Sequence, residues 1–414
     1  MIFKNLHDFV GNTTCAKRCV SNVAKVLKEN GFIELDEKEH WEKPDDVKGV
    51  YVIRGGSLIA VKMTKKLKGF FGVLTHTDSP HFKIKINPEM IQNCYIKLNV
   101  EPYGGSIYYS WLDKPLSICG TLIDKSGRQV EVDTGLDYQV FIPSQAIHIN
   151  REVNASNSIN PQKDMLPVAG LGNEECFFEK MKAIAGLQDD ILAYDLSLYN
   201  PEPVKTVKWG YSNIAMGPRL DNLSSVYSAM EAFVAEGAEV IDNYASVLVA
   251  FNSEEIGSAT FEGADGTFLI SVLERICKMY GVEKYAAFAS SKFLSIDAAH
   301  ALHPNAPEKS DPTNIVKFDG GVVIKHNANY ANDIELEAHI KKICNKRNIK
   351  VQDFYARSDM HCGSTLGNIN MSHLGIRTLD IGIPMLGMHS AVETISMNDV
   401  LELECLIYYY YKAY

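Results

Sequence analysis

Imidazole and carboxylate side chains stand directly after several apolar runs of this 414-residue chain. They are, in chain order, His76 and Asp78 after residues 70–74, Asp221 at the start of an apolar helical pattern, Glu254 and Glu255 after residues 247–251, Asp297 after residues 293–296, and His389 beyond residues 378–381. In open α/β sheets, ligands bind at the carboxyl ends of the strands. We therefore expect these side chains to converge if the strands are neighbours.

This set of side chains has the composition of a two-metal site. Imidazole and carboxylate ligands suit zinc, cobalt and manganese without any thiolate, and five ligands can hold two ions about 3.5–4 Å apart when one carboxylate bridges them. The adjacent pair Glu254 and Glu255 offers one metal ligand and one general base for a water molecule. Asp78 lies two residues from His76 and suits a carboxylate that orients the imidazole.

Each of these residues also has a simpler interpretation when it is taken alone. A single His or Asp near a strand end is usually a hydrogen-bonded turn residue. The pair Glu254 and Glu255 is typical of a solvated helix start, where the helix dipole favours negative charge. Only the joint pattern indicates a metal centre.

The segments that carry these residues have the sequence pattern of an α/β fold. Residues 70–74 and 247–251 are short apolar runs, the pattern of strands buried on both faces. A helical face of Leu223, Val226 and Met230 lies between them. The alternation predicts a mixed, mostly parallel sheet flanked by helices, built from residues 1–88 and 209–414.

A β-rich segment, residues 89–208, interrupts this alternation. Its apolar runs are residues 95–100, 107–111, 116–123, 130–132, 138–142 and 191–198, with turn residues such as Gly104 and Gly105 between them. Closely spaced strands without intervening amphipathic helices predict an inserted β-barrel or sandwich. A chain of this length also exceeds what one hydrophobic core usually supports, so we expect two domains.

Composition and charge exclude several classes of protein. The chain carries 41 Lys and Arg against 51 Asp and Glu, a net charge of −10 with no basic run, which argues against a nucleic-acid partner. No apolar run approaches the roughly 20 residues that span a bilayer, so we expect no membrane partner. The nine cysteines form no CxxC pair, and the first residues lack the apolar stretch of a signal peptide. We expect a soluble, cytoplasmic protein with reduced thiols.

Six motifs, taken in order, resemble a known family. They are HTDSP at 76–80, RLDN at 219–222, SEEIGS at 253–258, SIDAAHALHPN at 295–305, SDMHCGSTLG at 358–367 and GMHSAVE at 387–393. Together they resemble the family of aspartyl aminopeptidase and vacuolar aminopeptidase I, which are dinuclear zinc exopeptidases. The resemblance covers nearly the whole chain, including the β-rich insertion.

The resemblance implies a role for each matching residue. It implies that one metal ion is held by His76 and Asp297, the other by Glu255 and His389, with Asp221 as the bridge, Glu254 as the general base and Asp78 orienting His76. The implied reaction is hydrolysis of the first bond of peptides with a free amino terminus. Two divalent ions per subunit are expected, zinc first, with cobalt or manganese as alternatives.

The resemblance also implies an assembly and a substrate pocket. In the family the insertion builds dimers that assemble into a tetrahedral dodecamer, and His148 in IPSQAIHIN would help stabilise the tetrahedral intermediate in a neighbouring subunit. The matching pocket residues are His300, Lys325 and Tyr330. A buried Lys would favour an acidic first side chain, whereas a strand-end Lys in water would favour none. Family members differ in this preference, so the preferred residue stays open.

Two other functions fit the same sequence features. One is another reaction on the same site, such as that of a di-metal deacylase or carboxypeptidase. Amino-terminally blocked peptides would discriminate this alternative, because an aminopeptidase does not cut them. The other is a non-catalytic assembly protein, which would not require five ligands and a base.

Overall fold

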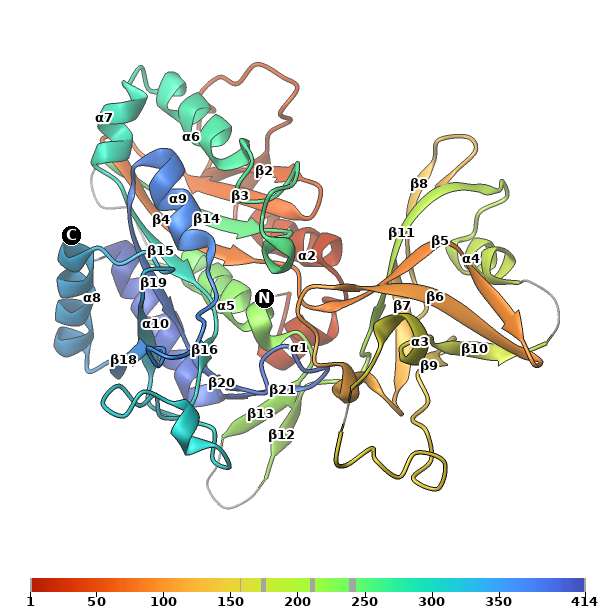
Figure 1. Cartoon of the computed structure of the whole chain (residues 1–414). Coiled ribbons are helices and arrows are strands. Elements are labelled where there is room, and N and C mark those ends of the chain that lie inside the picture. The colour runs from red at the N-terminus through yellow and green to blue at the C-terminus, as the bar shows by residue number, and fades with distance from the viewer. Residues whose placement is uncertain (1, 157, 173–175, 209–212, 238–242, 413–414) are drawn as a thin grey trace. The chain divides into compact units, whose positions relative to one another are not determined.

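The structure is a computed structural model that describes residues 2–156, 158–172, 176–208, 213–237 and 243–412 (Figure 1). Its contacts divide the chain into two compact units. The first comprises Met1–Asp78, Val204–Met388 and Glu393–Tyr414, and the second comprises Ser79–Pro203 and His389–Val392. The boundaries expected at 88/89 and 208/209 fall inside strand β5 (His81–Gln92) and just after strand β12 (Lys205–Val207).

The first unit is built on a mixed sheet of nine strands within the described residues. In spatial order they are β1 (Phe32–Glu34), β2 (Gly49–Arg54), β3 (Ser57–Lys62), β14 (Tyr244–Phe251), β4 (Gly69–His76), β15 (Lys292–Ile296), β19 (Arg377–Gly382), β17 (Val322–His326) and β18 (Val351–Tyr355). The central strands β14, β4, β15 and β19 are parallel to one another. The carboxyl ends of these four strands therefore lie side by side along the same edge of the sheet.

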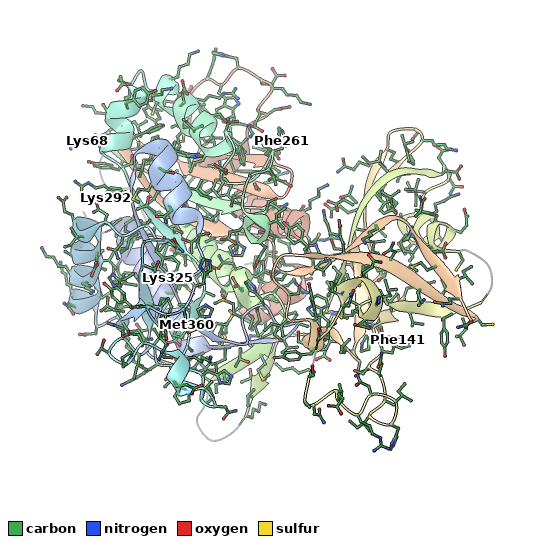
Figure 2. The ribbon with its side chains drawn as sticks, in the orientation of Figure 1. Lys68, Phe141, Phe261, Lys292, Lys325 and Met360 are labelled. Atoms are coloured by element: carbon green, nitrogen blue, oxygen red, sulfur yellow. The ribbon has the colours of Figure 1, made fainter. Side chains whose placement is uncertain are left out.

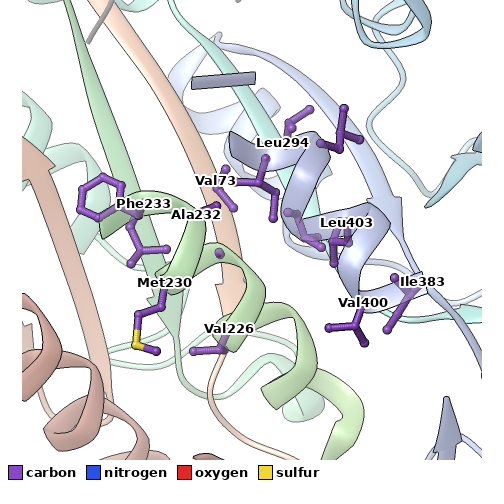
Figure 3. Packing of buried hydrophobic residues seen from close by; sticks show 14 of the residues in the cluster. Val73, Val226, Met230, Ala232, Phe233, Leu294, Ile383, Val400 and Leu403 are labelled. Atoms are coloured by element: carbon purple, nitrogen blue, oxygen red, sulfur yellow. The ribbon is translucent and has the colours of Figure 1, made fainter. Parts of the chain in front are cut away.

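Helices cover both faces of this sheet. One face carries α1 (Leu6–Gly11), α2 (Ala16–Glu29), α5 (Leu220–Val234), α8 (Ile334–Arg347) and α10 (Met397–Lys412), and the other carries α6 (Phe268–Met279), α7 (Lys284–Ala289) and α9 (Leu366–Leu374). An apolar core lies between the sheet and the helices on each face. The side chains of β4 alternate between the two cores: Phe71 and Val73 lie in the first, and Phe70 and Leu74 lie in the second. Figure 3 shows α5 and α10 packed over Val73 in the first core.

A small sheet completes the first unit. Its strands are β12, β13 (Ile214–Gly217), β21 (Glu393–Ser396), β20 (Pro384–Leu386) and β16 (Ala299–His300). A short 3₁₀ helix, η3 (Pro307–Lys309), follows β16 in the chain. Over the residues that the structure describes, no helix is both long and apolar enough to cross a membrane.

The second unit is a closed antiparallel sheet that resembles a barrel. Its order is β11 (Ile191–Tyr199), β5, β6 (Tyr95–Tyr103), β10 (Val168–Leu171), β9 (Val140–Phe141), β7 (Pro115–Asp124) and β8 (Gln129–Asp133). Strand β11 also pairs with β7, which closes the sheet. Two helices, α3 (Pro161–Asp164) and α4 (Phe177–Ala185), accompany the strands. The expected β-rich insertion is therefore confirmed.

One expected strand of this unit is wrong. Tyr108–Trp111 form a 3₁₀ helix, η1, preceded by Ile107, and residues 107–111 belong to no strand that the structure describes. The rings of Tyr108 and Trp111 lie 5.9 and 5.2 Å from the ring of Phe82. These residues are apolar because they pack on the core of the unit, and periodicity alone cannot separate that packing from strand pairing.

Candidate metal centre and active site

The carboxyl edge of the central strands gathers the predicted ligands of the first unit. His76 is the last residue of β4, and Asp297 directly follows β15. Glu254 and Glu255 lie in a 3₁₀ turn, η2 (Glu254–Ile256), shortly after β14. The backbone amide of Thr77 donates to the Phe251 carbonyl at 2.7 Å, which ties the ends of β4 and β14 together.

Asp221 is held at the start of α5 by an irregular backbone. Arg219 has a left-handed conformation (φ 57°), Asp221 and Asn222 are non-helical, and the peptide bond between them is cis. Asn222 donates to the Ile296 carbonyl at 2.8 Å, beside Asp297, and the Asp221 amide donates to the Glu393 carboxylate at 2.9 Å. The beginning of α5 is thereby fixed against the end of β15.

The sequence prediction missed Glu393 and Asn222. Glu393 is fully buried and is the last residue of GMHSAVE, while Asn222 is the last residue of RLDN. The sequence signal for both residues is their position in these motifs, because each motif continues past its expected ligand to a further polar residue.

The spacing around His76 is that of metal ligands. Its Nε2 atom lies 3.4 Å from Asp221 Oδ1 and 3.5 Å from Asp297 Oδ1. These distances exceed those of ordinary hydrogen bonds, but ligand atoms around tetrahedral zinc lie about 3.3–3.6 Å apart when the bonds are 2.0–2.2 Å long. Glu254 and Glu255 also offer atoms that lie within 4.8 Å of each other and of His76. The donor set and its spacing therefore fit a divalent metal.

Asp78 does more than the sequence predicted. Its backbone carbonyl oxygen lies 3.1 Å from His76 Nδ1, and its Oδ1 atom lies 3.4 Å from the same nitrogen. Its two carboxylate oxygens accept the backbone amides of Glu254 and Glu255, each at 3.2 Å. Asp78 thus contacts the imidazole mainly through its backbone and the glutamate pair through its carboxylate.

Negative charge exceeds positive charge at this edge of the sheet. Burial lowers the pKa of His76, but the carboxylates of Asp221, Asp297 and Asp78 outweigh it and hold that pKa well above its ordinary value. Burial raises the pKa of Glu254 to about 8 and also raises that of Glu255, with neighbouring carboxylates adding to both shifts. Such carboxyl groups are stabilised in their charged form when a cation binds among them.

Lys325, labelled in Figure 2, is buried beside the candidate ligands. Its side chain is 2% exposed, and its Nζ atom lies 3.1 Å from Asp297 Oδ2 and 5.3 Å from the centre of the Tyr330 ring. Burial raises the pKa of Asp297, but Lys325 and His76 outweigh it, so the pKa lies below its ordinary value. Lys325 is therefore not a solvated strand-end side chain.

The other two predicted pocket residues differ in burial. Tyr330 is buried, and its hydroxyl accepts from the Cys362 thiol at 3.2 Å. His300 is exposed on β16, with its ring 6.1 Å from that of Phe354.

Two predicted site residues belong to the second unit. His148 is exposed in the turn around residues 146–150, and its side chain has no interaction partner within the described part of the chain. His389 has a left-handed backbone (φ 66°). Its carbonyl accepts the Ile107 amide at 3.0 Å, and its Nδ1 atom lies 3.3 Å from the Gly105 carbonyl oxygen. The metal role of His389 and the catalytic role of His148 remain predictions from the sequence.

Comparison with known proteins assigns the family. A family model described as aminopeptidase I zinc metalloprotease (M18) matches residues 9–411. The chain belongs to the M18 family. It is accordingly a metal-dependent exopeptidase of the hydrolase class, and the family implies release of amino-terminal residues from peptides by a zinc metallopeptidase.

Relatives in the M18 family match along nearly their full length. The chain is 38% identical over 416 residues to a probable M18 family aminopeptidase 2 of Clostridium novyi, covering 95% of this chain and 94% of the relative. It is 39% identical over 423 residues to the protein of the same description from Clostridium acetobutylicum, covering 97% and 96%.

Solved structures of M18 proteins share the fold. A structure described as crystal structure of prApe1 superimposes with a TM-score of 0.91 at 27% identity, covering 98% of this chain and 94% of that one. The S. cerevisiae mApe1 dodecamer superimposes with a TM-score of 0.84 at 25% identity, covering 99% and 97%.

Proposed function

We propose that this M18 enzyme hydrolyses the first peptide bond of substrates with a free amino terminus, with two divalent metal ions bound at the carboxyl edge of the sheet. The metal-like spacing of His76, Asp221 and Asp297 carries the proposal. One ion would be held by His76 and Asp297, the other by Glu255 and His389, and Asp221 would bridge them. Zinc fits this donor set and the family, and cobalt and manganese share its ligand preferences.

When bound, the metal ions supply Lewis acidity that polarises the scissile carbonyl and acidifies the attacking water. Glu254 takes the proton of that water and delivers it to the leaving amine. Burial and neighbouring carboxylates raise the pKa of Glu254 to about 8, and the positive charge of bound metal ions would lower it again, which would leave the ionised carboxylate able to accept a proton. Asp78 holds the Glu254 backbone by a hydrogen bond of 3.2 Å, so the base is positioned before substrate binds.

Substrate recognition is proposed for the wall beside Asp297. Lys325 and Tyr330 are buried there, and Lys325 brings a positive charge. An acidic first side chain would gain a charge-assisted contact with Lys325. Because Lys325 already contacts Asp297, it would also fix the orientation of that ligand. His300, exposed on β16, is proposed as a further substrate contact.

The proposed assembly uses the second unit. A dodecamer is described for the S. cerevisiae relative, and we propose dimers that assemble into a tetrahedral dodecamer here. The exposed His148 would then act in the site of a neighbouring subunit, where it would stabilise the developing oxyanion. The molar mass of the native protein in solution tests this assembly, and a monomer with full activity would contradict it.

The decisive variant for the mechanism is Glu254→Gln, which keeps the shape of the side chain but cannot accept a proton. We expect kcat to fall by about 100- to 10,000-fold on aminoacyl substrates while the metal content stays unchanged. Glu29→Gln makes the same chemical change at an exposed site on α2 and should leave kcat unchanged. Glu254→Gln with full metal and full rate would show that another group is the base.

The same assay shows whether the substrate needs a free amino terminus and which first residue is preferred. A panel of free and amino-terminally acetylated aminoacyl substrates should show cleavage only of the free forms, with Asp and Glu preferred if Lys325 faces the first side chain. Cleavage of acetylated substrates would favour the deacylase alternative.

A further inference from the structure

A basic pocket lies between α8 and α10, on elements that supply no residue to the proposed active site. It has a volume of about 330 Å³ and is lined by His339, Lys342, Ile343, Lys346 and Arg347 of α8 and by Tyr409 and Lys412 of α10. No Asp or Glu is among these lining residues. Figure 1 shows the two helices beside each other. We call this feature the α8–α10 pocket.

Three cations of the α8–α10 pocket have no carboxylate partner among the described residues. Neighbouring Lys341, which points elsewhere, pairs with Glu337 and Asp353 at 2.8 and 2.9 Å. By contrast, Lys342 and Lys346 form no ion pair with any residue that the structure describes, and the same holds for Arg347. These three cations are exposed to solvent, on a chain of net charge −10.

The helix dipole explains only part of this pattern. Lys346 and Arg347 lie in the last turn of α8, where cations offset the partial negative charge of the helix end. Lys412 likewise lies in the last turn of α10. The effect is confined to the last turn, so it does not account for Lys342. The nearby Glu402 of α10 accepts the backbone amide of Lys350 at 3.2 Å and does not line the pocket.

Two of the cations, Arg347 and Lys412, contact tyrosine side chains. The Arg347 guanidinium lies 4.1 Å from the centre of the Tyr409 ring, and Lys412 Nζ donates to the Tyr408 hydroxyl at 2.6 Å. Stacking uses the face of a guanidinium and leaves its in-plane N–H donors for another partner. The half-buried His339 has a lowered pKa, because of burial and then the positive charges of Lys292 and Lys342. Positive potential therefore converges on the pocket.

We infer that the α8–α10 pocket binds a phosphorylated small molecule. Lys and Arg favour phosphate because each of its oxygens accepts charge-assisted hydrogen bonds. A volume of about 330 Å³ lies in the range of small-molecule sites. Several cations around one cavity suit a ligand with more than one phosphate group. The site is independent of the peptidase reaction, and its test does not require the proposed function.

Isothermal titration with fructose 1,6-bisphosphate at low ionic strength tests the inference, with fructose as the uncharged control. The wild-type protein should bind about one bisphosphate per chain and no fructose, and added salt should weaken binding. The variant Lys342→Gln, Lys346→Gln should lose affinity by about tenfold or more, because charged contacts are lost. Lys25→Gln, Lys28→Gln removes two exposed lysines from α2 and should bind like wild type.

A charge-preserving variant guards against a folding defect. Lys342→Arg, Lys346→Arg should keep the wild-type affinity, and all variants should share the thermal midpoint of the wild type without ligand. The inference is overturned if wild type shows no saturable binding at low salt. Equal affinity of wild type and Lys342→Gln, Lys346→Gln would overturn it as well.

Discussion

Two clusters in the first unit contain the same residue types, a histidine with carboxylates whose ligand atoms lie within 4.8 Å of one another. One is His76, Asp221 and Asp297; the other is His326, Glu337 and Asp353. In the second cluster, Lys341 Nζ lies 2.8 Å from Glu337 and 2.9 Å from Asp353, so a side-chain cation already neutralises the carboxylates.

The cluster around His76 keeps an excess of carboxylates among the residues that the structure describes. Lys325 pairs with Asp297, but burial and mutual repulsion raise the pKa values of Glu254 and Glu255. Both nitrogens of His326 are engaged, by Asp353 at 2.9 Å and by Asn332 at 2.6 Å. The two clusters therefore differ in charge balance and in the hydrogen bonds of their histidines, although they share residue types. This difference is the reason why the proposed metal site is placed at His76.

The largest difference between the two clusters is expected from Asp221→Asn. Because Asp221 is the proposed bridge, the variant should hold well under one metal ion per chain after dialysis. Its peptidase rate should fall by at least about a thousandfold, since the metals contribute several kcal/mol of charge stabilisation. Elemental analysis and an aminoacyl substrate assay measure both quantities.

Asp353→Asn is the matched control, because it removes a carboxylate from the cluster that Lys341 neutralises. Its metal content and rate should equal those of the wild type. Equal losses in Asp221→Asn and Asp353→Asn, or no loss in Asp221→Asn, would contradict the distinction between the clusters.

A smaller effect is expected from Asp78→Asn. Asp78 contacts His76 and both glutamate amides but is not a proposed ligand. Residues that orient metal ligands typically contribute 10- to 100-fold in affinity, so we expect metal binding to weaken by about that factor. Competition with a calibrated chelator measures the affinity, and a wild-type affinity would show that Asp78 does not position the site.

The smallest effect is expected on the pH dependence of the free energy of unfolding, through Asp353 of the second cluster. Burial raises the pKa of Asp353, but the contacts with Lys341 and His326 outweigh it, so its folded pKa lies below the unfolded value of about 3.9. A carboxyl group whose pKa is lower in the folded than in the unfolded state stabilises the fold when the pH is above the unfolded-state pKa. This stabilisation is lost as the pH falls through the folded-state pKa.

Wild type should therefore exceed Asp353→Asn in stability at pH 6 by less than about 1 kcal/mol, since the pair is partly exposed. The difference should shrink as the pH falls below about 4. Urea unfolding midpoints of both proteins measure it, and a difference that does not change with pH would show that Asp353 acts without its charge.

The sequence predicts that His76, Asp297 and the glutamate pair lie close together. Apolar runs locate the buried strands, and the carboxyl ends of parallel strands meet at one edge of a sheet. It did not reach the backbone contacts between Asp78 and the glutamates, since those depend on the conformation of the turn after β14. It also missed the approach of Gly382, where a side chain would collide with the Asp297 carbonyl. The apolar pattern of residues 107–111 wrongly predicts a strand, because aromatic residues that pack on a core occur both in strands and in short helices.

The central claim is that two metal ions at this edge support peptide hydrolysis. Zinc titrated into metal-free protein, with hydrolysis of a free-amino aminoacyl substrate followed at each step, tests it most directly. We predict that the rate rises and then levels off at two zinc ions per chain. Full activity at one ion per chain, or activity that does not depend on added metal, would contradict the two-metal account.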